Sequence, residues 1–159
     1  MQRVRSQQGF TIIEMLIVLA IAGLILSMIL VVIPTLQRNS RNNQRKQDVQ
    51  AILGNVSHYA LNNSGNFPPD SQNANSIKDG LRLSYYSIDS IEIQSRPSGT
   101  AISPTTPLDL DRVIVANRQK CAADGSGAAT QNGAGYSDVV ALYMIETGGG
   151  NTSQRCQEL

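Results

Sequence analysis

The chain has 159 residues and a formal net charge of +1, so its overall charge gives no indication of nucleic acid or of an acidic partner. It contains no Trp, five Tyr, two Phe and two Cys. About 125 residues follow an N-terminal apolar run, which is enough for one small soluble domain and too few for two.

Residues 1–9 form a short basic leader that carries Arg3 and Arg5 and no acidic side chain. Residues 10–33 are almost entirely apolar and predict a helix about 36 Å long, enough to cross a hydrocarbon core of ~30 Å. A helix that is apolar on every face belongs in lipid or in a large core. The run is too long for a secretory signal. We therefore expect one membrane helix with its N-terminus in the cytoplasm and the following domain outside.

Three residues in this run or directly after it stand out. Glu14 is the one charge in the run, and a carboxylate inside a membrane helix costs roughly 2.5–3.5 kcal/mol on insertion scales, which indicates a function. The alternative is a side chain that reaches water from the membrane interface. Gly23 is a weak helix former, and Pro34 removes one backbone donor, so we expect the helix to be weakened between them.

Residues 34–61 are expected to extend the helix as an amphipathic segment. Residues 37–48 contain no aliphatic side chain, and we interpret them either as a solvated spacer or as a contact surface for neighbouring helices. Apolar residues then recur at helical spacing and predict a stripe that packs on a soluble domain: Val49, Ile52, Leu53, Val56, Tyr59 and Ala60.

Residues 62–159 are expected to form a globular head. Its first part, residues 62–80, has a loop composition. Strands are expected at residues 81–86, 88–94, 112–116 and 139–145, and residues 148–153 are expected to be a flexible hairpin or tail. One helix with three or four short strands predicts an α+β fold with an antiparallel sheet.

The two cysteines, Cys121 and Cys156, lie in the domain that we expect outside the membrane and favour one disulfide. Two free thiols in a reducing compartment are the alternative. No spacing supports a metal site, and no cofactor is expected. Asp109, Asp111 and Asp124 carry possible calcium ligands, but a solvated acidic turn fits them better.

Catalysis and nucleic-acid binding receive little support from the sequence. His58 is the only histidine, and no converging set of catalytic residues accompanies it, so we expect no enzyme. Arg112, Arg118 and Lys120 could form a small basic patch for nucleic acid, although the neighbouring aspartates largely offset it.

Gly9-Phe10-Thr11-x-x-Glu14, behind a basic leader and inside an apolar run, resembles the prepilin cleavage signature of type IV pilins and other class III signal peptide proteins. A glycine such as Gly23 within the apolar helix and a cysteine pair near the C-terminus are also features of that family. The resemblance implies a pilin-like α+β fold. It also implies that a prepilin peptidase cuts between Gly9 and Phe10 and methylates the new amino group of Phe10.

The same resemblance implies roles for further residues. Glu14 would pair with the Phe10 ammonium of a neighbouring subunit, because a buried carboxylate is tolerable when paired. Gly23 and Pro34 would bracket a segment that often loses helicity in assembled pilins. Pro34 lies later than the usual family position, which leaves the length of that segment open.

The function that the resemblance implies is that of a structural subunit, which polymerises with itself into a pilus for adhesion, motility or DNA uptake. Its partners would be the assembly platform and its ATPases. It would be a single-pass inner-membrane protein first and part of an extracellular filament when mature. A minor pilin or a type II secretion pseudopilin is the alternative, and the cysteine pair favours a pilin. A signal-anchored extracytoplasmic domain is the remote one.

Overall fold

The structure is a computed structural model that describes residues 9–68, 88, 90–94, 102, 108–124, 126–130 and 138–159. It contains two compact units, Met1–Asn39 and Ser40–Leu159, which we describe separately. The strand expected at residues 81–86 lies outside the described residues.

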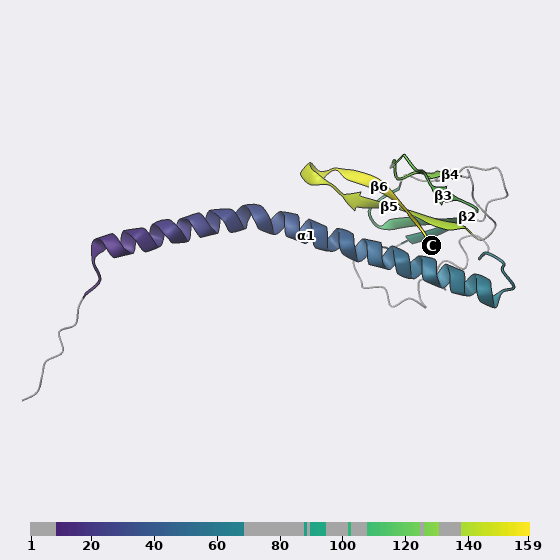
Figure 1. Cartoon of the computed structure of the whole chain (residues 1–159), viewed down its shortest axis with the longest axis horizontal. Helices are drawn as coiled ribbons and strands as arrows, with labels where there is room; N and C mark the ends of the chain where they lie inside the picture. Colours follow the sequence, from purple (N-terminus) through teal and green to yellow (C-terminus); the bar gives the residue numbers. More distant parts are fainter. Residues whose placement is uncertain are drawn as a thin grey trace, which may run out of the picture. The chain divides into compact units, whose positions relative to one another are not determined.

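A single helix, α1 (Ile12–Asn62), runs through both units (Figure 1). It begins two residues later than the sequence predicts and ends one residue later. At its C-terminal end the Gly65 N–H donates to Ala60 O at 2.8 Å, and Ser64 takes a φ of 59°. This arrangement resembles a Schellman cap, which satisfies carbonyl groups that a helix end would leave unpaired.

The first unit is a bare apolar helix. Its large hydrophobic side chains are exposed to between 42% and 83% of their surface. The span is long and apolar enough to cross a membrane, and none of its most apolar window is buried. Exposure of this size in water would be strongly unfavourable, so these side chains need lipid or other helices around them.

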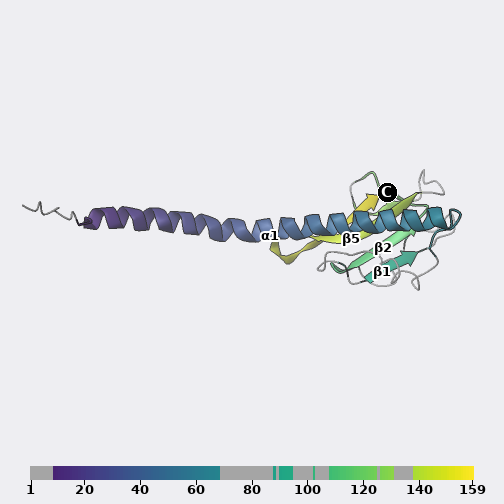
Figure 2. The ribbon, with the colours of Figure 1, turned by 90° about the horizontal axis from the view of Figure 1, so that it is seen from below.

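The second unit packs the C-terminal part of α1 on a four-stranded sheet. In Figure 2 this part of the helix passes in front of β5, with β2 and β1 beside it. The helix contributes the most deeply buried residues of its predicted stripe, and every second residue of the strands faces them. The core contains Val49, Ile52, Leu53, Val56, Ile91, Ile93, Val113, Val115, Ala141 and Tyr143.

The sheet has the strand order β1-β2-β5-β6, with bounds Ser90–Gln94, Arg112–Asn117, Val139–Glu146 and Thr152–Glu158. The pairs β2–β5 and β5–β6 are antiparallel, as the sequence predicts. The pair β1–β2 is parallel, so the sheet is mixed and the expectation of a wholly antiparallel sheet needs this correction. The interval between Gln94 and Arg112 is long enough for the crossover that a parallel pair requires. The α+β fold class itself is confirmed.

Residues 148–153, expected to be a flexible hairpin or tail, form the connection of an antiparallel β5–β6 hairpin and the start of strand β6. Strand β6 pairs with β5 along its whole length and continues to a hydrogen bond from Leu159 N–H to Val139 O of 3.2 Å. Between the two strands, Gly148–Gly150 form a short 3₁₀ turn. Residues 152–158 are therefore an edge strand of the sheet and not a loose segment.

A small second sheet of β3 (Lys120–Cys121) and β4 (Ala129–Thr130) lies beside β6. Gly127 in this segment has a φ of 73°, and a Cβ there would collide with Gln154 O on β6. The Gln154 side-chain amide donates to Gly127 O at 2.9 Å. The segment thus covers part of the outer edge of β6, where unpaired backbone groups would otherwise invite another chain to pair.

Candidate processing and assembly site

Gly9 and Phe10 lie just before α1, exposed and outside regular helix. The helix starts with a reciprocal pair of contacts between Thr11 and Glu14. The Thr11 N–H and Oγ1 donate to Glu14 Oε2 at 3.1 and 3.0 Å, and the Glu14 N–H approaches Thr11 Oγ1 at 3.4 Å. This is a capping box, which fixes the first turn of a helix. The Gly9–Phe10 peptide bond therefore lies immediately outside a defined helix start.

The capping box gives Thr11 a role that the sequence analysis did not assign to it. The sequence does contain the pattern, because Thr or Ser followed three residues later by Glu before an apolar run is a known helix-start motif. The contact also gives Glu14 a partner within its own chain. A carboxylate bonded to a backbone N–H and a hydroxyl is easier to hold at the edge of an apolar helix than a bare one.

The helix is continuous through Gly23 and Pro34. Two hydroxyl side chains near these positions bond back to helical carbonyls, Ser27 Oγ to Leu24 O at 2.8 Å and Thr35 Oγ1 to Val32 O at 2.7 Å. Around Gly23 no heavy atom from elsewhere lies within 4 Å of a Cβ built there. The single chain is thus helical here, and loss of helicity on assembly stays a prediction.

Four residues join α1 to the end of β5 in the second unit, and we call them the Glu146 clamp: Arg41, Asn42, Arg45 and Glu146. The carboxylate of Glu146 accepts hydrogen bonds from Arg41 Nε at 2.9 Å, from Arg41 Nη2 and from Arg45 Nη1 at 3.0 Å. Asn42 bonds to the Glu146 backbone in both directions, at 2.8 and 2.9 Å. The polar stretch of α1 is therefore, in part, a contact surface for the head of its own chain.

The clamp shifts the pKa values of Glu146 and Arg41. The hydrogen bond from Arg41 is the largest cause that lowers the pKa of Glu146 to about 2, with Arg45 adding to it. The same hydrogen bond raises the pKa of Arg41. The ion pairs of the clamp therefore persist well below neutral pH.

Cys121 and Cys156 form a disulfide with a Cα–Cα distance of 5.5 Å. It joins β3 to β6, and the Cys121 N–H donates to Glu158 Oε1 at 2.6 Å beside it. The crosslink thus holds the last strand from its outer side, while β5 holds it from the inner side.

The three basic residues considered for nucleic acid are not gathered into one patch. Arg112 begins β2 and Arg118 follows its end, so about 20 Å of strand separates them. Arg112 Nη1 lies 3.6 Å from Glu92 Oε2, and Lys120 Nζ lies 3.6 Å from Asp138 Oδ2. A surface of paired charges gives little support to nucleic-acid binding.

Asp124 and His58, which were considered for calcium binding and for catalysis, make local contacts within the chain. Within the described part of the chain, no group of three or more His, Cys, Asp or Glu side chains could hold a metal ion. Asp124 accepts a hydrogen bond from the Ser126 N–H at 2.9 Å, and its contacts with Ser126 lower its pKa. His58 is exposed on α1 and contacts Asn62 at 3.0 Å. Both residues have ordinary structural roles.

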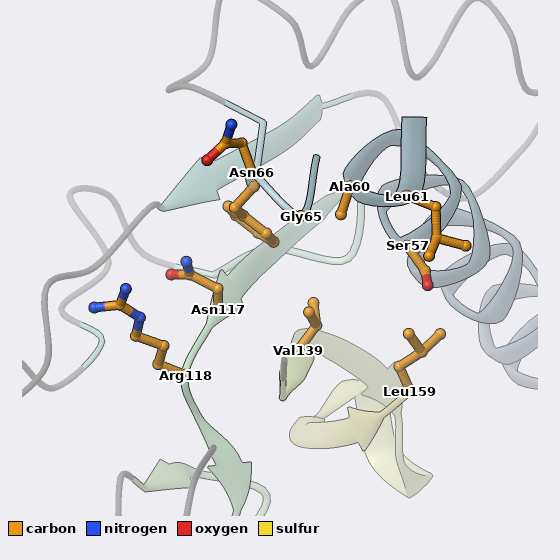
Figure 3. A pocket seen from close by; sticks show the side chains of 10 residues that line it. Ser57, Ala60, Leu61, Gly65, Asn66, Asn117, Arg118, Val139 and Leu159 are labelled. Carbon is orange, nitrogen blue, oxygen red and sulfur yellow. The ribbon is translucent and has the colours of Figure 1, made fainter. Parts of the chain in front are cut away.

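A pocket of about 430 Å³ opens where α1 and β2 end and β5 begins (Figure 3). Leu61 and Leu159 line it, and they are the two large hydrophobic side chains that the described residues of the second unit leave exposed. Asn66, Asn117 and Arg118 add polar groups. The described lining has no His, Cys, Asp or Glu side chain, so the pocket offers a surface for contact and no acid–base pair for chemistry.

Comparison with known families finds one match. Residues 4–30 match the prokaryotic N-terminal methylation motif, the class III signal peptide of type IV pilins. No curated protein and no solved structure matches the chain. With its apolar N-terminal helix, the chain fits a membrane-anchored precursor of the type IV pilin or pseudopilin kind. The motif indicates a structural subunit and not an enzyme.

Proposed function

We propose that this chain, a precursor with the class III signal peptide of type IV pilins, is the structural subunit of an extracellular pilus. The methylation motif carries the proposal, because it joins a cleavage signature to a helix whose apolar surface is wholly uncovered. Lipid covers that surface before assembly, and the helices of other copies cover it afterwards. The filament would serve adhesion, motility or DNA uptake.

In this proposal the prepilin peptidase cuts between Gly9 and Phe10 on the cytoplasmic side, removes residues 1–9 and methylates Phe10. The new ammonium group at Phe10 then pairs with Glu14 of a neighbouring copy and sets the axial register. Glu14 exchanges its contact with Thr11 for a stronger, charged one. The assembly platform and its ATPases drive the process.

A pseudopilin or a minor pilin is the second candidate function, since the same motif occurs in their precursors. The Cys121–Cys156 disulfide supports a pilin, because major pseudopilins tend to have a calcium-holding C-terminal loop and no disulfide. The described residues offer no such cluster.

The test is the intact mass of the chain in filaments sheared from the producing cell. We expect a species that lacks residues 1–9, is heavier by one methyl group and is lighter by the two hydrogens of a disulfide. A Gly9→Leu variant is the control, since a bulky side chain there should block the peptidase. If the unaltered chain occurs only at full length in the membrane fraction, the pilus proposal is wrong. If the processed species is only a trace of the sheared material, the chain is a minor pilin.

A further inference from the structure

We propose that the head binds a second copy of itself through opposite charges on two different surfaces, so that a cationic groove beside β6 receives the acidic turn 109–111 of the next copy. The inference rests on the proposed filament function and adds the surface by which neighbouring heads recognise one another. It concerns the second unit alone.

The groove, which we call the β6 groove, has a volume of about 740 Å³. Lys46 of α1 and Arg155 of β6 provide its positive charge, and both side chains belong to exposed residues. Its one acidic side chain among the described lining residues is Glu158, whose Oε1 accepts the Cys121 N–H at 2.6 Å. The groove is therefore a surface of net positive charge. The remaining lining is Asn42, Asn43, Cys121, Tyr143, Ile145, Cys156 and Gln157.

The acidic turn precedes β2. Asp109 and Asp111 are both exposed, and backbone hydrogen bonds hold the turn at each end. The Arg112 N–H donates to Asp109 O at 3.2 Å, and the Ser90 N–H donates to Asp111 O at 3.1 Å. The position of the turn is thus set by β1 and β2, while its two carboxylates stay in solvent.

These four residues stand out against the other charges of the head. Within the described residues, no ion pair includes Lys46, Arg155, Asp109 or Asp111, whereas four salt bridges use Arg41, Arg45, Arg112, Lys120, Glu92, Asp138 and Glu146. Asp124 and Glu158 are also in none of these salt bridges, but their carboxylates accept the Ser126 N–H at 2.9 Å and the Cys121 N–H at 2.6 Å. The groove cations and the carboxylates of the acidic turn therefore differ from them in having no partner of this kind among the described residues. Charge complementarity between two surfaces steers association and fixes register.

The sheet places the acidic turn at the start of β2 and the groove beside β6, two strands away and at a similar height. Val113, two residues after Asp111, is in register with Tyr143, which is in register with Arg155. Strand β5 lies between β2 and β6, so these two strands are about 10 Å apart. A contact between unlike surfaces of two copies is heterologous, and such contacts build rings or helical filaments. A subunit that polymerises needs a contact of this kind.

Charge reversal in the full-length chain tests the pairing. We expect the Lys46→Glu/Arg155→Glu variant and the Asp109→Lys/Asp111→Lys variant each to lower sheared filament yield by about tenfold or more, because like charges would face each other. The chain with all four changes should regain most of the yield, since the charges then match again. Gln50→Glu, on the exposed side of the same helix, is the control and should leave the yield unchanged. Membrane levels of each variant are measured in parallel to identify loss of the folded subunit.

A disulfide crosslink between copies tests the same contact even if a reversal variant folds poorly. In a Lys46→Cys/Asp111→Cys chain, oxidation of filaments should produce dimers and a ladder of higher species that reductant removes. Unchanged filament yield in both reversal variants, or only monomers after oxidation of normal filaments, would overturn the inference and leave the pilus proposal intact. Absence of processed, sheared material from the unaltered chain would instead overturn the pilus proposal itself.

Discussion

Glu146 joins the head to α1 through five hydrogen bonds. Its carboxylate accepts three hydrogen bonds from two arginines, its backbone O accepts one from Asn42 Nδ2, and its backbone N–H donates one to Asn42 Oδ1. Arg45 is almost fully buried, and a buried guanidinium without its partner is strongly unfavourable. The clamp therefore holds one position of the helix against the end of β5 and disfavours others.

The pH dependence of stability should report this clamp. The pKa of Glu146 is lowered from 4.5 to about 2 in the folded head, so its stabilising effect is complete above about pH 4.5 and is lost as the pH falls towards 2. We expect the midpoint of thermal unfolding to fall over this range by a few degrees more in the unaltered chain than in Glu146→Gln. The comparison cancels other carboxylates such as Asp124. Parallel curves for the two chains would contradict a role for Glu146.

The clamp could not be predicted from the sequence. Residues 37–48 are polar throughout, so no periodic pattern distinguishes the side that meets a partner. The partner of Arg41 lies 105 positions away in the chain, at a strand end whose location depends on the whole sheet. The N-terminal residues differ in this respect. Gly9, Phe10 and Glu14 form a local motif that can be read directly, and Thr11 needed only the capping-box pattern.

At the scale of the element, α1 separates buried from exposed leucines over a short distance. Leu53 is 1% exposed in the core, and Leu61 is 78% exposed two turns later. Leu53→Ala should lower the free energy of unfolding by about 2–5 kcal/mol, because it leaves a cavity. Leu61→Ala makes the same change in helix propensity and should stay within about 0.5 kcal/mol. Urea unfolding of the detergent-solubilised chain measures both. Equal effects would mean that the core is not where the structure places it.

The disulfide should stabilise β6 more than any other element. Removing it with Cys121→Ser/Cys156→Ser should cost about 3–4 kcal/mol in the chain-entropy model, since the crosslink closes a loop of 35 residues. Changing both cysteines avoids a free thiol that could pair wrongly. The measurement is thermal unfolding of the unaltered chain with and without reductant, next to the double variant. An identical melting profile in the presence and absence of reductant would show that no bridge contributes.

The elements that the sequence predicted well are those whose pattern is local. β2 and β5 contain runs of Val, Ile, Leu and Ala that fit a buried strand. β6 reads Thr-Ser-Gln-Arg-Cys-Gln-Glu, with no aliphatic side chain, so its strand form comes from pairing with β5 and from the disulfide. The direction of β1 is equally non-local, because nothing within Ser90–Gln94 decides whether it pairs parallel or antiparallel.

At the scale of the whole molecule, one helix has to serve two environments. Its first part exposes a continuous apolar surface, while the part in the second unit packs a narrow stripe on a sheet. Glu14 is the charged residue inside the apolar part, and its carboxylate already accepts the Thr11 N–H at 3.1 Å. Two roles for Glu14 are therefore separable: capping the helix in its own chain, and pairing with Phe10 of the next copy.

Two substitutions separate these roles. Glu14→Gln keeps a side chain that can complete a capping box, whereas Glu14→Ala removes both the cap and the charge. Membrane insertion should persist in both variants, because neither adds a charge to the apolar span. If pairing with the Phe10 ammonium directs assembly, both variants should lose most of the sheared filament, since neither offers a carboxylate. If capping alone matters, Glu14→Gln should assemble at the yield of the unaltered chain while Glu14→Ala does not. Filament yield and membrane levels of the two variants, measured side by side, decide which contact of Glu14 the filament requires.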